Sequence, residues 1–219
     1  AKALLAQSGL RWREPLEPLE DAGVIARGSP AQLAFDFRRG FVEHVEMTAA
    51  AFARDAARVF AIAPIRFVTL REVAAHPEAL ASPHLARIAG LAAIAQGIDD
   101  AAIEALAQSP HARRLRWLAI PGNRLTARGL DAICASPNLR DLLYCECSGN
   151  GFGDPVDRYS HEGEAIITTT RTELGRELER RFGTQPWLHA PWYFGAAYPP
   201  DLEDAADAKP ATSEEYASV

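Results

Sequence analysis

Three stretches spaced 27 residues apart decide the fold: GLAAIAQGI (90–98), WLAIPGNRL (117–125) and YCECSGNGF (144–152). Each has apolar or cysteine side chains at its second and fourth positions, an amide at its seventh and an apolar side chain at its ninth. Ser-Pro dipeptides precede the three stretches with the same spacing, at Ser82, Ser109 and Ser136. A fixed period of this length indicates a stack of repeated structural units.

Each nine-residue stretch predicts a short strand followed by a turn. Apolar residues two apart lie on one side of a strand, so Leu118 and Ile120 are expected to face the core. Asn123 follows where the chain leaves the strand, and a buried amide there can bond backbone groups that the turn leaves unpaired. Apolar residues at helical spacing, such as Leu130 and Ile133, predict a helix that covers the unit. One unit cannot bury its own apolar face, so the units are expected to stack.

Two less regular units precede the three clear ones. Residues 64–70 predict a strand, and the return segment after it, residues 71–81, is short and contains Pro77. Residues 41–47 alternate in polarity, which is typical of a strand, and residues 48–60 predict a helix with Thr48 as its N-cap. We therefore expect about five parallel strands in chain order.

Stacked units of this kind curve, because a helix is wider than the spacing of about 4.8 Å between strands. The expected fold is α/β: a short right-handed horseshoe, or solenoid, with the sheet on the concave face and the helices on the convex face. In residues 156–200, the segment 166–170 is prone to form a strand, and Thr170-Arg171-Thr172-Glu173 fits a capping box for a helix through about Phe182. The expected parts are an N-terminal cap or linker (1–40), the repeats (41–155), a C-terminal cap (156–200) and an acidic tail (201–219) that is disordered when alone.

The composition excludes several classes of protein. The 219 residues carry a net charge of −6, and residues 201–219 alone hold six acids against one lysine, a net of −5. This balance argues against a nucleic-acid partner, and no apolar run approaches the roughly 18 residues of a membrane span. Three cysteines cannot all pair, so a reducing compartment, the cytoplasm, is the simpler location. We expect a monomer.

The strand–turn–helix unit resembles the ribonuclease-inhibitor type of leucine-rich repeat, whose period is similar. More narrowly, the chain is similar to bacterial leucine-rich-repeat proteins in which the array follows a short repeat-companion domain. The segments that carry this resemblance, within residues 35–200, are Arg38–Val45 (RRGFVEHV), Ala81–Leu85 (ASPHL), Ser148–Pro155 (SGNGFGDP), Glu177–Gly183 (ELERRFG) and Pro186–His189 (PWLH). The departures are the small Ala93, Gln96 in place of Asn, and Cys145 and Cys147 in place of aliphatic residues.

The resemblance implies a repeat protein that binds another protein as a scaffold, and it supplies no catalytic residue. It would also place the companion domain upstream of Ala1. Because the chain starts without Met, we expect it to be part of a longer one.

A protein partner is expected on the concave face, where residues that flank the inward pairs point outward. We call this side of the sheet the strand face, and the pattern predicts three rows across it. The first row is His44, Phe67, Gly90, Trp117 and Tyr144; the second is Glu46, Thr69, Ala92, Ala119 and Glu146; the third is Thr48, Arg71, Ile94, Pro121 and Ser148.

The first row is unusually aromatic for a position that is expected to be exposed, and aromatic residues are favoured anchors at interfaces. The predicted partner-binding residues are His44, Phe67, Arg71, Trp117, Tyr144 and Glu146. The alternative is that these rings pack on one another or beneath the C-terminal segment.

Aromatic residues also crowd the Pro-rich segment after residue 186. They predict packing over the exposed end of the last repeat, which every stack of repeats must cover. The alternative is a docking segment for a larger assembly, formed by Trp187, Trp192, Tyr193 and Phe194.

Possible chemical motifs all have a simpler structural interpretation, so no catalytic residue, metal site or cofactor is predicted. Cys145 and Cys147 occupy inward positions, where core packing explains them, and Cys134 is interpreted in the same way. His161-Glu162-Gly163-Glu164 lacks metalloprotease spacing and is interpreted as a solvated loop. The glycines of residues 149–153 fit a turn that leaves the repeat. Arg113, Arg114 and Arg116 fit either a solvated face or an acidic partner.

Three functions are consistent with these patterns. The first is a non-catalytic module that binds a protein partner through the strand face. The second is a structural or regulatory subunit of a larger bacterial assembly, docked through the C-terminal aromatic segment. The third is the recognition part of an enzyme whose catalytic region lies elsewhere.

Overall fold

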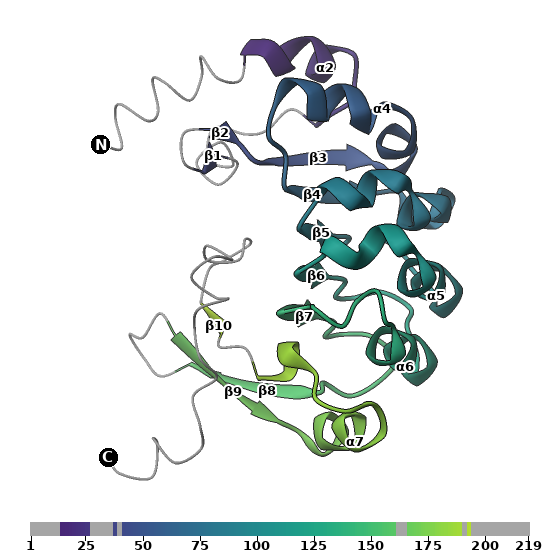
Figure 1. Ribbon diagram of the computed structural model, residues 1–219, viewed down its shortest axis with the longest axis vertical. Helices are drawn as coiled ribbons and strands as arrows, with labels where there is room; N and C mark the ends of the chain where they lie inside the picture. Colours follow the sequence, from purple (N-terminus) through teal and green to yellow (C-terminus); the bar gives the residue numbers. More distant parts are fainter. Residues whose placement is uncertain (1–13, 27–36, 39–40, 161–165, 190–191, 194–219) are drawn as a thin grey trace.

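A five-stranded parallel sheet, with its strands in chain order β3-β4-β5-β6-β7, forms the centre of the molecule (Figure 1). Its strands are β3 (His44–Thr48), β4 (Phe67–Arg71), β5 (Gly90–Ala92), β6 (Trp117–Ala119) and β7 (Tyr144–Glu146). The computed structural model describes residues 14–26, 37–38, 41–160, 166–189 and 192–193, of which 37–38, 158–160, 166–169 and 192–193 are described by their backbone alone. The predictions for residues 161–164, Phe194 and 201–219 lie outside these residues.

The register of the sheet confirms the period found in the sequence. Leu91 pairs with Leu118, and Leu118 pairs with Cys145, so residues 27 apart lie side by side on neighbouring strands. Between β4 and β5 the offset is 23 residues, from Phe67 to Gly90. The unit that begins at β4 is therefore shorter than those that begin at β5 and β6.

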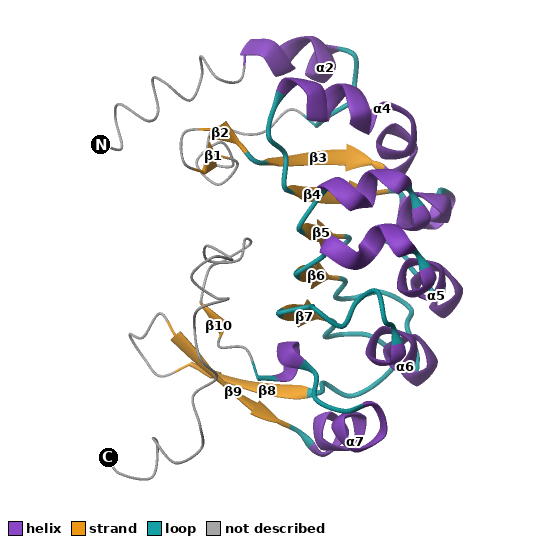
Figure 2. Cartoon of the chain, viewed as in Figure 1, coloured by secondary structure: helices purple, strands orange, loops and turns teal. Residues whose placement is uncertain are grey.

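Three α-helices cover one side of this sheet (Figure 2). They are α4 (Ala49–Ile62), α5 (Asp100–Gln108) and α6 (Ala127–Ala135). Side-chain oxygens of Thr48, Asp99 and Thr126 accept hydrogen bonds from the first turns of the three helices, as N-caps do. The core between the sheet and the helices is apolar, and its inward strand residues Leu70, Leu91 and Leu118 are fully buried.

Short 3₁₀ helices carry the chain back to the sheet. They are η2 (Val73–Ala75), η3 (Pro77–Ala81), η4 (Pro83–Arg87) and η5 (Pro110–Arg114). The buried hydroxyls of Ser82 and Ser109 accept from backbone N–H groups at the starts of η4 and η5. After β4, η2 and η3 take the place of an α-helix, which explains the shorter unit.

The amide side chains after β5, β6 and β7 bond the backbone of neighbouring units, as the sequence predicts. Asn123 accepts from the N–H groups of Gln96 and Ile98 at 2.9 and 3.1 Å, and donates to the carbonyls of Ala93 and Ile120. Asn150 repeats the pattern one unit later: it accepts from Leu125 N and donates to Cys147 and Ile120.

The residue before each amide has a left-handed backbone. Gly122 and Gly149 adopt φ values of 65° and 66°, where glycine meets no steric penalty. Ala95 and Glu72 take the same conformation at 53° and 58°, although L side chains rarely do. The same turn therefore follows four successive strands.

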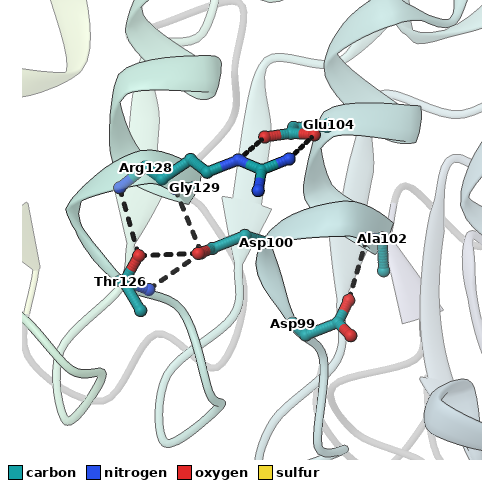
Figure 3. A network of polar contacts seen from close by, with 7 residues as sticks. All are labelled: Asp99, Asp100, Ala102, Glu104, Thr126, Arg128 and Gly129. Atoms are coloured by element: carbon teal, nitrogen blue, oxygen red, sulfur yellow. Dashed lines mark hydrogen bonds and ion pairs between the residues drawn. The ribbon is translucent and has the colours of Figure 1, made fainter.

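A polar network ties α5 to α6 (Figure 3). The Asp100 carboxylate accepts from the Thr126 backbone N–H and hydroxyl at 2.8 and 2.6 Å, and from the Gly129 N–H at 3.0 Å. Partial burial acts to raise the pKa of Asp100, but these hydrogen bonds outweigh it and hold the pKa below its usual value. Arg128 on α6 also pairs with Glu104 on α5.

Residues 14–26 cover the first edge of the core. They form η1 (Glu14–Leu16) and α2 (Glu17–Asp21), and the Ala26 N–H donates to the carbonyl of Glu46 on β3 at 2.8 Å. Leu16, Leu19, Val24 and Ile25 are buried there. The short antiparallel pair β1 (Phe37–Arg38) and β2 (Phe41–Val42) precedes β3.

The other end carries a separate antiparallel sheet of order β10-β9-β8. Its strands are β8 (Val156–Ser160), β9 (Ile166–Arg171) and β10 (Trp192–Tyr193). The helices α7 (Glu173–Phe182) and η6 (Pro186–Leu188) lie between β9 and β10 in the chain. The helix ends at Gly183 as predicted, but its N-cap is Thr172 and not Thr170, because β9 continues through Arg171. Strand β8 was not predicted from the sequence.

The fold is thus α/β, with helices on one side of a parallel sheet. Within the described ranges, no helix combines the length and apolarity that crossing a membrane requires.

Candidate interaction surface

The rows predicted for the strand face are the rows that the register produces. His44 pairs with Phe67, Phe67 with Gly90, Gly90 with Trp117, and Trp117 with Tyr144. The second row follows in the same strands. The strand face is therefore a real side of the sheet, opposite to the helices.

The expectation that the first row is exposed is wrong. The exposed fractions of His44, Phe67 and Trp117 are 8%, 4% and 6%, so all three are buried, and Tyr144 is half-buried. The Phe67 ring lies against Gly90, so closely that a Cβ at residue 90 would collide with it. Because glycine leaves this space, the large ring of one strand covers its neighbour.

The Trp117 and Tyr144 rings stack next to this pair. Their centroids are 5.3 Å apart and their planes differ by 12°, and Trp117 also packs with Ala92 and Ala119 of the second row. This small apolar cluster is separate from the main core. It explains why the row is aromatic: the rings pack along the sheet and bury their small neighbours Ala92 and Ala119.

Polar contacts fix the β3–β4 side of the strand face. The Nε2 atom of His44 lies 3.0 Å from the hydroxyl of Thr69. Arg71, at the end of β4, forms a 2.8 Å ion pair with Glu46 on β3, and the arginine side chain remains 54% exposed. The pair joins the second and third rows.

The most accessible part of the face lies where the strands end. Ile94, in the third row, is 55% exposed, more than any other large hydrophobic side chain among the described residues. Beyond it, Pro121 and Ser148 are half-buried, and the Glu146 carboxylate accepts from the Ser148 N–H at 2.9 Å. The partner-binding prediction omitted Ile94, although its third-row position identified it as outward-facing.

The proposed docking residues of the C-terminal segment have different positions. Trp187 is buried in η6, which packs against β7, and its indole Nε1 has no hydrogen-bond partner within the described part of the chain. Trp192 and Tyr193 form β10, which pairs with Ile166 and Ile167 of β9. Trp187 thus covers the last strand of the parallel sheet, as a cap does.

The three cysteines are buried free thiols, as expected for core residues. Burial raises the pKa of the Cys134 thiol to about 12. A hydrogen bond with Cys147, together with burial, raises the pKa of Cys145 well above its usual value. The thiolate populations of Cys134 and Cys145 at neutral pH are therefore very small, which argues against a nucleophilic role for these two thiols.

A pocket of about 460 Å³ lies on the helix side, where the short unit meets α5. Val73 and Pro77 line it from the 3₁₀ helices, Ala101 and Ala105 line it from α5, and Arg124 lies at its rim. A missing helix explains the space, because η2 and η3 fill less volume beside α5 than α6 does on its other side. Pro77 in the short return segment was the sequence signal for it.

No group of three or more His, Cys, Asp or Glu side chains in the described ranges is placed to hold a metal ion. Comparisons of the chain with protein-family models, with curated proteins and with solved structures find no match.

Proposed function

We propose that this chain is a leucine-rich-repeat protein whose strand face binds a protein partner without catalysis. The 27-residue register, the amide side chains that bond one unit to the next, and the left-handed turn after β4, β5, β6 and β7 support the repeat assignment. A curved solenoid is the expected shape of such a stack.

The observation that carries the binding proposal is the exposed Ile94 beside the Arg71–Glu46 ion pair. An apolar side chain flanked by a pair of opposite charges is a common composition for the centre and rim of an interface. We assign direct contact to Arg71, Ile94, Glu146 and Tyr144. His44, Phe67 and Trp117 are buried in the same face of the sheet and hold the surface in shape.

A surface of this kind binds with little loss of conformational freedom. Its backbone is fixed by strand pairing, and its first-row rings are already packed, so few side chains need to be ordered on binding. Three free cysteines remain consistent with a reducing compartment such as the cytoplasm.

The test is affinity purification from the native cells with an Ile94→Asp variant. We expect the partner that the wild type retains to be lost, with affinity reduced at least about tenfold, because a charge would be buried against the partner. The matched control is Ile62→Asp: Ile62 is 42% exposed, but it ends α4 on the helix side. Equal retention by both variants would contradict the strand-face assignment.

A further inference from the structure

Most exposed arginines of this protein are paired with a carboxylate. Arg54 and Arg58 bond Asp55, and Arg71 bonds Glu46. The same holds for Arg128, Arg171, Arg176, Arg180 and Arg181. Within the described residues, exposed arginines without such a partner are the minority.

Four arginines that differ from this pattern gather in one place. Arg87, Arg113, Arg114 and Arg140 are exposed, and no carboxylate partner of theirs is found among the described residues. Each lies in the segment just before a strand, within η4, within η5 or after Ser136. Arg124, at the rim of the pocket, also lacks a carboxylate partner but lies elsewhere.

The stacking of the units brings these segments together. Helices η4 and η5 pack on each other, and the Arg113 side chain reaches Asn138 in the next unit at 3.0 Å. The backbone continues the contact: Arg116 N donates to Ala89 O, and Leu143 N donates to Arg116 O. We call Arg87, Arg113, Arg114, Arg116 and Arg140 the arginine edge.

This edge is strongly basic on an acidic protein. The segments 82–90, 109–117 and 136–144 contain five arginines and one acid, Asp141, a net charge of +4, whereas the whole chain has −6. Asp141 lies 3.5 Å from Arg116, and the two side chains remain 55% and 37% exposed to solvent, so Asp141 neutralises the edge only weakly. The charge is thus concentrated where the three units meet.

The guanidinium groups are held in different ways. Arg87 lies over the Phe60 ring at 5.3 Å, and Arg113 is oriented by the neutral amide of Asn138. Arg114 and Arg140 have no side-chain partner within the described part of the chain. Two guanidinium groups are therefore positioned and two are free to turn toward a ligand.

We propose that the arginine edge binds an acidic segment of a protein partner, through carboxylates that engage guanidinium groups of successive units. Guanidinium groups favour carboxylates because both are planar and can form two parallel hydrogen bonds. This surface is distinct from the strand face, so it stands or falls independently of the proposed function.

An acidic peptide fits better than a nucleic acid. The rest of the chain has a net charge of about −10. A long polyanion would extend beyond the three units and be repelled by these negative charges, whereas a short acidic segment would contact the arginine edge alone.

The experiment measures fluorescence anisotropy of a labelled peptide of ten glutamates with the complete chain at low ionic strength. We expect saturable binding that is lost as salt rises, since screening removes contacts between exposed charges. The combined variant Arg87→Gln, Arg114→Gln and Arg140→Gln should bind at least about tenfold more weakly. The unfolding curve of this variant is measured as well, to verify that it is as fully folded as the wild type under the conditions of the binding experiment.

The matched control combines Arg54→Gln, Arg176→Gln and Arg180→Gln. These arginines are also exposed and the change in net charge is the same, but they lie outside the edge. An equal loss in both variants, or no binding by the wild type, would overturn the proposal. So would a labelled single-stranded DNA that binds through the edge when the peptide does not.

Discussion

The boundary between the units that begin at β5 and β6 differs from the boundary between the short unit at β4 and the unit at β5. At the first, Asn123 takes two N–H donors and gives two bonds to carbonyls, and α5 packs against α6. At the second, Gln96 accepts a single bond, from Glu72 N at 2.6 Å, and its other end bonds Ile94 O in its own turn. The pocket beside α5 lies at this second boundary.

The difference shows how the length of one unit determines what its neighbour can bond. The short unit returns to the sheet through 3₁₀ helices, so α5 has less surface to pack against. It also provides a single backbone N–H, that of Glu72, to the side chain of Gln96. The longer glutamine side chain remains half-buried, whereas Asn123 is 8% exposed. Stability should therefore be concentrated at the boundary between two full-length units.

The largest expected effect comes from the two amides. Asn123→Ala leaves three backbone groups, the N–H groups of Gln96 and Ile98 and the carbonyl of Ala93, without their side-chain partner, whereas the Ile120 carbonyl still accepts from Asn150. Each group left unpaired costs about 1–3 kcal/mol when water cannot fully replace the lost bond. We expect a loss of about 3 kcal/mol for Asn123→Ala and about 1 kcal/mol for Gln96→Ala, measured by urea unfolding. Equal losses would remove the distinction between the two boundaries.

A smaller effect is expected at Gly129, where α6 meets Asp100. A Cβ there would lie 2.5 Å from the Asp100 Oδ1 atom and disturb the hydrogen bond from Gly129 N. We expect Gly129→Ala to destabilise by about 1 kcal/mol, although alanine is the better helix former by a similar amount. In an Asp100→Ala background the sign should reverse, which a double-mutant cycle by chemical denaturation detects. Additive effects would show that the two residues do not interact.

The smallest effect is the pH dependence of the Asp100 contacts. Because the pKa of Asp100 is lowered in the folded protein, its carboxylate contributes stability above its unfolded pKa of about 3.9 and loses it as pH falls through the folded pKa. The difference in stability between wild type and Asp100→Asn should be less than about 1 kcal/mol at neutral pH and vanish in acid. The Asn123→Ala difference should lack this dependence, since an amide does not titrate. Unfolding midpoints from pH 6 to about pH 3 provide the comparison.

Much of the parallel sheet could be predicted because its pattern is local and repeated. The inward pairs, the Thr48 cap and the amide turn each depend on residues a few positions apart, and the period transfers the result from one unit to the next. Cys145 and Cys147 are an example. Two cysteines so close in sequence are often associated with metal or redox chemistry, but their inward positions in the repeat predicted burial, and both are buried.

The state of the strand face could not be predicted in the same way. Alternation places Phe67 and Trp117 opposite the helices, and the register agrees. Their burial depends on Gly90 leaving room for one ring and on Tyr144 stacking on the other, contacts between residues 23 and 27 positions apart. A side chain's orientation follows from its own strand, but its exposure depends on its neighbours.

The arginine edge shows both contributions. The five arginines just before the strands, the period, the inward residues and the turn amides can all be found in the amino-acid sequence, because they depend on local backbone geometry and on a repeated pattern. Three properties follow from the folded arrangement alone: four of these arginines lack a carboxylate partner among the described residues, most of the first row is buried, and the short unit leaves a pocket. Those properties depend on which side chains of different units meet, and packing in three dimensions fixes that.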